Sequence, residues 1–278
     1  MSIRLVAIDL DGTLLDSRKR LSERNRNAIA ACARRGIQVV PCTGRTVMGI
    51  PESVLSIPGI RYAIVVNGAG IEDLQEKKTL DRQLLSRRTA LEIIELVKNR
   101  RIMYDVYIEG VGISEDRFYN HLEDYNIPEE IKPLIRRTRR PEPSIEEYVR
   151  YWNGDVDKMN LYFTDLRDRE SIRSQLEKRG DVLVSSSLGT NLEINGPGAA
   201  KGEALLRLAS ILGISREETM ACGDGENDAS MIRMAGIGVV MANGDPQLKA
   251  EADYITDSND EDGVAAALEK LALSGGLH

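Results

Sequence analysis

The hydrophobic and polar positions of this chain follow two different patterns: short apolar runs in some stretches, and alternation of apolar with other residues in another. Residues 3–10, 37–41 and 62–66 are short, mainly apolar runs, as in strands that are buried on both faces. Between the first two runs, Ser22 is placed to cap a helix, and Gly36 is placed to end it. A succession of strand, helix and strand predicts a parallel, doubly wound sheet.

The second pattern begins at about residue 84. Ser86 is placed to open a helix that runs to Lys98. Apolar side chains then alternate with others over residues 102–109 and again over residues 159–163. A period of two predicts strands of a sheet with one packed face and one free face.

The first pattern, in which apolar strand-like runs alternate with helices, returns near Leu192. A helical pattern over residues 201–212 is followed by strand-like runs at 219–222 and 237–241. We therefore expect an α/β core made of residues 1–82 and 191–278. An α+β domain, residues 83–190, is expected to be inserted into that core.

Composition and charge narrow the classes of protein. An apolar fraction of 42% suffices for a packed core, so the chain is not of a disordered class. The 44 acidic residues outnumber the 37 lysines and arginines, giving a net charge of −7. This balance argues against a nucleic-acid partner and favours a divalent cation. The basic run at residues 132–140 is accordingly interpreted as a solvated loop.

Targeting features suggest a compartment. Residues 1–10 lack the basic start and long apolar stretch of a signal peptide, and no apolar run reaches the roughly 18 residues of a membrane span. The three cysteines have no metal-type spacing, and their odd number argues against a disulfide framework. We expect a cytoplasmic protein with no membrane partner. The oligomeric state does not follow from the sequence.

Polar side chains gather where the predicted core strands end. They are Asp9 with Asp11, Thr43, Lys201, and Asp224 with Asp228. Ligands of open parallel sheets bind outside the carboxyl ends of the strands, so we expect these residues to share one crevice.

The types of these residues indicate a chemistry. Clustered carboxylates raise one another's pKa unless a cation neutralises them, and oxygen ligands without His or Cys suit Mg²⁺. Asp9 at a strand end is a rigid nucleophile position, and Gly12 lets the following turn approach closely. The positive charge of Lys201 is unfavourable at a helix start, where the helix dipole is also positive. A bound phosphate would be attracted both by Lys201 and by the helix start.

Four motifs in order resemble those of the haloacid dehalogenase superfamily of phosphotransferases, and within it the Cof-like sugar-phosphatase branch with an α/β cap. The matching segments are residues 9–13 (Asp-Leu-Asp-Gly-Thr), 43–45 (Thr-Gly-Arg), 201–202 (Lys-Gly) and 223–228 (Gly-Asp-Gly-Glu-Asn-Asp). The resemblance extends over essentially the whole chain. It implies a Rossmann-like core with an inserted cap.

The resemblance also implies roles for the carboxylates. Asp9 would be the nucleophile and a metal ligand. Asp11 would be the general acid and base, and its backbone carbonyl would bind the metal. Asp224 would bind Mg²⁺, and Asp228 would be a further ligand or would hold metal-bound water.

A second group of residues would bind the phosphate of the substrate. The resemblance assigns this role to Thr43 with Gly44, to Lys201 and to Asn227. Arg45 is a possible substrate-binding residue, and pairing with a carboxylate is an equally good interpretation.

The function that follows is hydrolysis of a small phosphomonoester, a sugar phosphate by resemblance, through an aspartyl-phosphate. One alternative is a phosphomutase of the same superfamily, which would need a bisphosphate primer. Another is a non-catalytic protein that binds a phosphorylated metabolite. That alternative predicts the loss of Asp9 or Asp11, and both are present.

Overall fold

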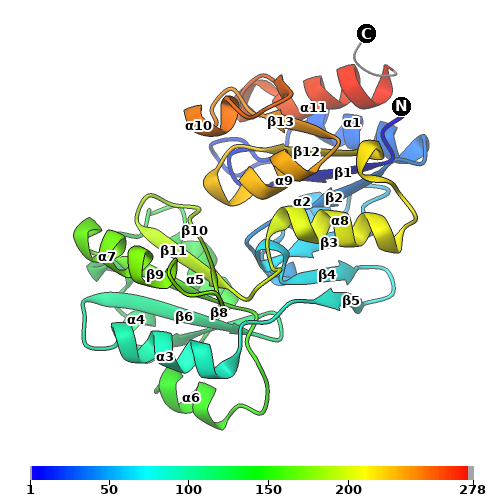
Figure 1. Ribbon diagram of the computed structural model, residues 1–278. Coiled ribbons are helices and arrows are strands. Elements are labelled where there is room, and N and C mark those ends of the chain that lie inside the picture. The colour runs from blue at the N-terminus through cyan, green and yellow to red at the C-terminus, as the bar shows by residue number, and fades with distance from the viewer. Residues whose placement is uncertain (1, 275–278) are drawn as a thin grey trace. The chain divides into compact units, whose positions relative to one another are not determined.

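The computed structural model of the protein describes residues 2–274 and divides into two compact units (Figure 1). The first unit consists of the chain up to Arg82 and from Ala200 onward, and the second of Gln83–Ala199. None of the helices in the described residues is long and apolar enough to cross a membrane.

The first unit contains a five-stranded sheet in which every pairing is parallel. In spatial order its strands are β14 (Tyr254–Ile255), β13 (Ile237–Val240), β12 (Thr219–Gly223), β1 (Leu5–Ile8) and β2 (Gln38–Pro41). All four residues of β1 are buried, as its uninterrupted apolar sequence predicts.

Helices cover both faces of this sheet, with α1 and α11 on one side and α8 and α9 on the other (Figure 1). The helices of this unit are α1 (Glu23–Arg34), α2 (Glu52–Leu55), α8 (Lys201–Ile211), α9 (Ala229–Met234), α10 (Pro246–Lys249) and α11 (Gly263–Ala267). The predicted start of α1 is confirmed, because Ser22 accepts a hydrogen bond from the Asn25 amide. Gly36 follows the helix with a φ of 77°.

A three-stranded antiparallel sheet continues the first unit. Its strands are β3 (Tyr62–Val65), β4 (Gly70–Asp73) and β5 (Lys78–Arg82). One parallel bridge, between Cys42 and Ile64, connects β3 to the chain just after β2. The run at residues 62–66 is therefore a strand as predicted, although it pairs mainly with an antiparallel neighbour.

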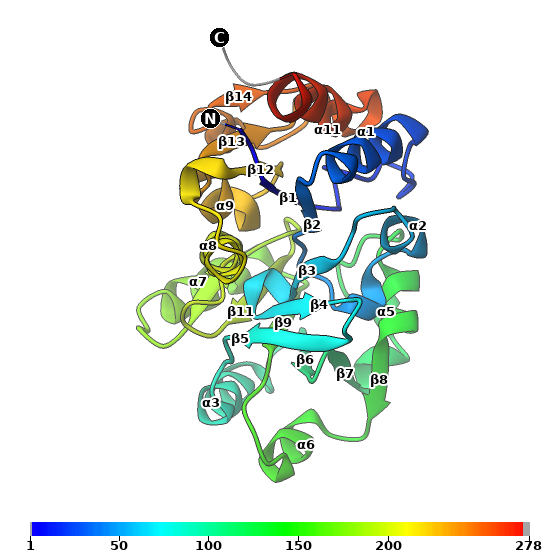
Figure 2. The same ribbon diagram turned by 90° about the vertical axis from the view of Figure 1, so that its right-hand side faces the viewer.

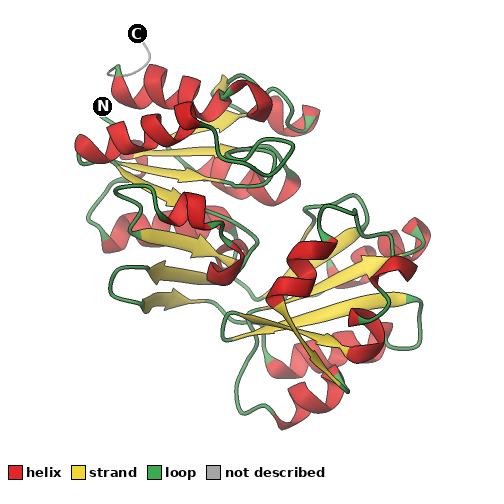
Figure 3. Ribbon diagram, turned by 180° about the vertical axis from the view of Figure 1, so that it is seen from behind, coloured by secondary structure: helices red, strands yellow, loops and turns green. Residues whose placement is uncertain are grey.

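The second unit is built on a six-stranded sheet (Figure 3). In spatial order its strands are β10 (Leu183–Ser185), β11 (Asn191–Asn195), β9 (Lys158–Phe163), β6 (Ile102–Ile108), β7 (Val111–Glu115) and β8 (Arg139–Glu142). Its helices are α3 (Arg87–Val97), α4 (Asp116–Tyr119), α5 (Lys132–Thr138), α6 (Ile145–Tyr151) and α7 (Leu166–Leu176). The pairings are antiparallel except for β7 with β8.

The prediction of a free sheet face in this unit is wrong. All seven residues of β6 are buried, including Asp105 and Tyr107 on the more polar face. Polar groups are tolerated there because they pair with one another. Arg139 forms an ion pair with Asp105 (2.9 Å), and Lys158 forms one with Glu193 (2.8 Å). Burial of a charge is acceptable only with such compensation.

The predicted solvated loop at residues 132–140 is also wrong, since it forms α5 and the start of β8. Its Arg139 side chain is buried against Asp105 and the Tyr107 ring. The parallel pattern predicted to return near Leu192 begins later. Because β11 pairs antiparallel with β9, the second unit extends to Ala199 rather than to residue 190.

Candidate active site

The candidate active site lies at the carboxyl edge of the parallel sheet. Asp9 directly follows β1, Thr43 follows β2 after one residue, and Asp224 directly follows β12. Since β12, β1 and β2 are neighbours with the same direction, these three ends are adjacent. Figure 2 shows β1 and β2 side by side in this sheet.

Three carboxylates and one lysine converge at this edge. Asp9, Asp224 and Asp228 each offer an oxygen, and these oxygens lie within 4.8 Å of one another. Lys201, at the first position of α8, is fully buried, and its Nζ donates to Asp9 Oδ1 (2.6 Å) and Asp228 Oδ1 (2.7 Å). Four of the residues proposed from the sequence are thus in one cluster.

The environment shifts the pKa values of these groups. Burial raises the pKa of Asp9 well above its usual range, and Asp228 and Asp224 add to this effect while Lys201 opposes it. Burial and the charge of Asp228 raise the pKa of Asp224 to about 7. Burial lowers the pKa of Lys201, but the charges of Asp228 and Asp9 outweigh it and raise that pKa. The carboxylates therefore favour additional positive charge among them.

Asp228 organises the loop that carries Asp224. Its Oδ2 accepts hydrogen bonds from the backbone amides of Asp224 (2.9 Å) and Gly225 (3.0 Å). The side chain packs so close to Gly223 that a Cβ there would lie 2.5 Å from the Cβ of Asp228. One oxygen of Asp228 thus holds the loop, and the other contacts Lys201.

Thr13 is a site residue that was not singled out from the sequence. It is fully buried, and its Oγ1 donates to Asp224 Oδ1 (2.6 Å). Gly12 precedes it with a φ of 84°, and a Cβ at Gly12 would lie 2.4 Å from Asp224 Oδ2. Thr13 closes the Asp-Leu-Asp-Gly-Thr motif, but its partner is 211 residues away, so its role could not be derived from local pattern.

The side chain of Asp11 faces other partners than that of Asp9. Arg45 forms a two-pronged pair with it, with Nε to Oδ2 at 2.8 Å and Nη2 to Oδ1 at 2.7 Å, and Lys19 lies 2.9 Å from Oδ1. Burial raises the pKa of Asp11, but the hydrogen bond and charge of Arg45 and the charge of Lys19 outweigh it, so this pKa is lowered. Of the two interpretations of Arg45, the structure shows pairing with a carboxylate.

The remaining predicted phosphate-binding residues lie in two segments, the loop after β2 and the short 3₁₀ helix Glu226–Asp228. Thr43 is buried, its Oγ1 accepts from the Arg45 amide (3.2 Å), and its carbonyl accepts from the Asn67 amide (3.0 Å). Gly44 lies between Thr43 and Arg45 in that loop. Asn227 is half-buried, and its Nδ2 donates to Asn67 Oδ1 at 3.4 Å. Asn67 was given no role from the sequence.

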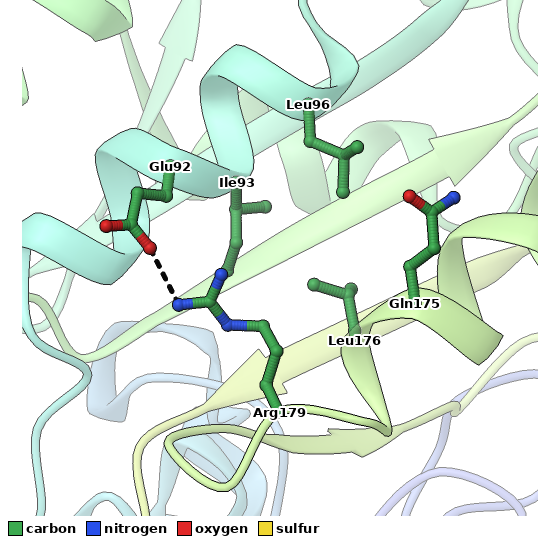
Figure 4. Close-up of a pocket in the computed structure, with 6 residues that line it drawn as sticks. All are labelled: Glu92, Ile93, Leu96, Gln175, Leu176 and Arg179. Atoms are coloured by element: carbon green, nitrogen blue, oxygen red, sulfur yellow. Dashed lines mark hydrogen bonds and ion pairs between the residues drawn. The ribbon is translucent and has the colours of Figure 1, made fainter.

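The second unit has a separate cavity of about 240 Å³ between α3 and α7 (Figure 4). Apolar side chains from both helices line it, and Arg179 closes one side through an ion pair with Glu92 (2.7 Å). Arg179 also pairs with Asp181 (2.8 Å). Its charge is therefore compensated within the unit.

A carboxylate at a strand end, with further carboxylates and a buried lysine around it on a doubly wound α/β fold, is an arrangement typical of phosphoryl-transfer enzymes. The chain belongs to the haloacid dehalogenase-like hydrolase family, whose model matches residues 6–268. The resemblance stated from the motifs is confirmed, as is the fold of a Rossmann-like core with a second, sheet-containing domain.

Two relatives that cover nearly the whole chain are named as phosphatases. The chain is 31% identical over 273 residues to the 5-amino-6-(5-phospho-D-ribitylamino)uracil phosphatase YcsE of Bacillus subtilis, with 98% of this chain and 97% of that protein covered. It is 29% identical over 265 residues to the pyridoxal phosphate phosphatase YbhA of Escherichia coli, covering 95% and 97%. The structure of a haloacid dehalogenase-like hydrolase from B. subtilis matches with a TM-score of 0.86 and 30% identity, covering 97% and 100%. The prediction of a phosphoric monoester hydrolase is confirmed.

Proposed function

We propose that the protein hydrolyses small phosphomonoesters with Mg²⁺, through a covalent phosphoryl group on Asp9. The observation that carries this proposal is the clustering of the Asp9, Asp224 and Asp228 oxygens, together with the bonds from the buried amino group of Lys201 to Asp9 and Asp228. A carboxylate beside a buried cation is placed to accept a phosphoryl group, because the cation offsets the charge that the group brings.

The residues present fit a magnesium ion. The three carboxylates supply hard oxygen ligands, and their oxygens lie close enough to share one ion. The raised pKa values of Asp9 and Asp224 fit the same interpretation, because a cation would offset the burial and the mutual repulsion that raise them. When bound, Mg²⁺ would neutralise charge on the attacking and transferring oxygens. Asp9, Asp224 and Asp228 would hold it, with the backbone carbonyl of Asp11.

In the first step, a carboxylate oxygen of Asp9 would attack the phosphorus and form a new P–O bond. The bond from phosphorus to the ester oxygen breaks, and that oxygen takes a proton from the carboxyl of Asp11, so that an alcohol leaves. Lys201 would hold an oxygen of the phosphoryl group on one side, and Thr43, Gly44 and Asn227 would hold it on the other.

In the second step, water would attack the phosphorus of the aspartyl-phosphate. Asp11, now ionised, takes a proton from that water, the bond to Asp9 breaks, and inorganic phosphate leaves. Before substrate binds, Arg45 and Lys19 lower the pKa of Asp11 and favour its ionised form. Its first role requires a proton, so Arg45 and Lys19 must release the carboxylate when substrate binds. Arg45 would then be available to contact the substrate.

The substrate class is a small phosphorylated metabolite, with sugar and sugar-alcohol phosphates as the leading group. The two named relatives act, by their names, on a phosphorylated ribitylamino compound and on pyridoxal phosphate. Specificity in such scaffolds comes from side chains that differ between relatives, so the particular metabolite has to be found by assay.

A panel assay tests this function. Purified protein would be incubated with sugar phosphates, sugar-alcohol phosphates, pyridoxal phosphate and nucleotides, and released phosphate would be measured with Mg²⁺ or with EDTA. We expect multiple turnover with at least one phosphomonoester, without a bisphosphate primer, and loss of turnover in EDTA that Mg²⁺ restores. Turnover that persists after exhaustive chelation contradicts the metal-dependent mechanism.

A further inference from the structure

The turn between β3 and β4 has an unusual backbone. Val66, Asn67 and Gly68 follow one another with φ angles of 53°, 59° and 99°. The left-handed region is uncommon for residues other than glycine, and a β-branched valine there is an outlier. Val66 and Asn67 are only 2% and 4% exposed. Such conformations persist only where the surroundings impose them, and they concentrate at functional sites.

One side of this turn is bonded to the loop that carries Thr43. The amide of Val66 donates to the carbonyl of Arg45 (2.9 Å), and the amide of Asn67 donates to the carbonyl of Thr43 (3.0 Å). The turn therefore fixes the main chain on both sides of Gly44.

The other side of the turn lies against the start of α8, and Figure 2 shows this helix beside β3 and β4. A Cβ at Gly68 would lie 2.5 Å from the carbonyl oxygen of Ala200, so the two backbones are in close contact. The carbonyl of Gly68 also accepts from Nη2 of Arg207 (3.0 Å) in the same helix. Ala200 directly precedes Lys201, so the turn also sets where α8 begins.

The side chain of Asn67 completes the connection, because its Oδ1 accepts from Nδ2 of Asn227. One turn thus contacts all three segments that supply Thr43, Lys201 and Asn227. We propose that Asn67 is a positioning residue that orients the Asn227 amide toward the substrate phosphate, an inference that rests on the phosphate-binding role proposed for these residues. Asparagine suits the position because it tolerates left-handed backbone and still offers an amide.

Two substitutions of Asn67 distinguish the contribution of its side-chain amide from that of its backbone conformation. Asn67→Gly keeps the positive φ and removes the amide, whereas Asn67→Ala removes the amide and strains the turn as well. For Asn67→Gly we expect KM for p-nitrophenyl phosphate and Ki for inorganic phosphate to rise together, with kcat/KM lower by about 10- to 100-fold. The melting temperature should fall less for Asn67→Gly than for Asn67→Ala. Wild-type KM and Ki for Asn67→Gly would show that only the backbone matters and would overturn the proposal.

A double mutant tests whether Asn67 acts through Asn227. We expect Asn67→Gly to change KM and Ki by less than about twofold in an Asn227→Ala background, because the partner is already absent. Losses that multiply in the double mutant overturn the proposal. So does an Asn227→Ala protein with wild-type constants.

Failure of the proposed function can be distinguished from failure of the role proposed for Asn67. A wild-type protein that hydrolyses no phosphomonoester contradicts the function. Calorimetric binding of inorganic phosphate with Mg²⁺ still tests the turn in that case. Weaker phosphate binding by Asn67→Gly supports the role of Asn67, and unchanged binding overturns it.

Asn25 is a matched control in the same unit. It is 1% exposed, its Oδ1 accepts from the Ala265 amide (2.8 Å), and its Nδ2 donates to the Leu14 carbonyl (3.3 Å). Asn25→Ala should lower the melting temperature and leave KM and Ki unchanged. If it raises KM and Ki as much as Asn67→Gly does, the effect reflects general loosening of the unit, and the specific role of Asn67 is refuted.

Discussion

At the scale of single residues, the two aspartates of the first motif are two positions apart and have opposite surroundings. Burial raises the pKa of Asp9, and the charges of Asp228 and Asp224 add to this effect although the neighbouring Lys201 opposes it. Asp11 is held by Arg45 and Lys19, which lower its pKa. Where the surroundings move the pKa values of two neighbouring titratable groups in opposite directions, one group commonly acts as the nucleophile and the other as the acid and base.

Substitution of each aspartate by asparagine separates these roles. Asp9→Asn should reduce turnover by roughly a thousandfold or more and leave no covalent phosphoenzyme, because an amide replaces the carboxylate that is proposed as the nucleophile. Asp11→Asn should slow turnover by about 10²- to 10⁴-fold, which is the usual contribution of a general acid and base. A substrate with a good leaving group should still phosphorylate Asp9 in that variant. Mass spectrometry after rapid acid quench locates the adduct, and an adduct on Asp11 would contradict the assignment.

Gly12 and Gly36 form a natural pair for a second test. Both have positive φ, 84° and 77°, so alanine should strain the backbone at each by about 1 to 2 kcal/mol. At Gly36 a Cβ would meet no other described atom within 4 Å, but at Gly12 it would lie 2.4 Å from Asp224 Oδ2. Gly12→Ala should therefore lower kcat/KM by about 100-fold as Asp224 is displaced.

Gly36→Ala should lose stability alone, measured by urea unfolding, with kcat/KM unchanged. Equal kinetic losses in the two variants would show that strain, rather than the contact with Asp224, explains the effect.

At the scale of elements, sequence patterns predicted the features that depend on neighbouring residues, such as helix caps and buried strands. The caps at Ser22 and Ser86 and the buried strand β1 follow from nearby residues, and they are confirmed. The pairing of β11 and the burial of the second face of β6 depend on strands far along the chain, which period alone does not identify. In the site the motif residues were found by type. The Thr13 and Asn67 contacts span 211 and 160 residues, so only the folded chain reveals them.

The ion pair between β9 and β11 gives a prediction at this scale. Lys158 and Glu193 side chains are 1% and 5% exposed, and their charged atoms are 2.8 Å apart. Lys158→Met should destabilise the second unit by about 3 to 5 kcal/mol, because it removes the buried cation that faces the Glu193 carboxylate. The double variant with Glu193→Leu should recover most of that loss. Urea unfolding measures both, and equal destabilisation of the single and double variants would contradict this account.

At the scale of the whole molecule, the candidate active site is assembled from segments near both ends of the chain. Lys201 contacts Asp9 across 192 residues, and the second unit lies between them in the sequence. The first unit thus cannot complete its site until segments on both sides of that insertion have come together. Anything that binds the assembled carboxylates and not the unfolded chain should stabilise the fold by mass action.

Magnesium should therefore stabilise the protein in a pH-dependent way. Without the metal, the folded state keeps a proton on Asp224 up to about pH 7, whereas the unfolded chain releases it near pH 4. Because the folded state binds more protons in this window, the contribution of Asp224 to metal-free stability falls as pH rises from about 4 to about 7. Mg²⁺ binds the ionised carboxylates, so its stabilising effect should grow over the same window. Differential scanning fluorimetry should show a larger Mg²⁺-induced rise in melting temperature at pH 8 than at pH 5. Asp224→Asn should weaken this pH dependence, and an equal rise at both pH values in the wild type would mean that the cation binds elsewhere.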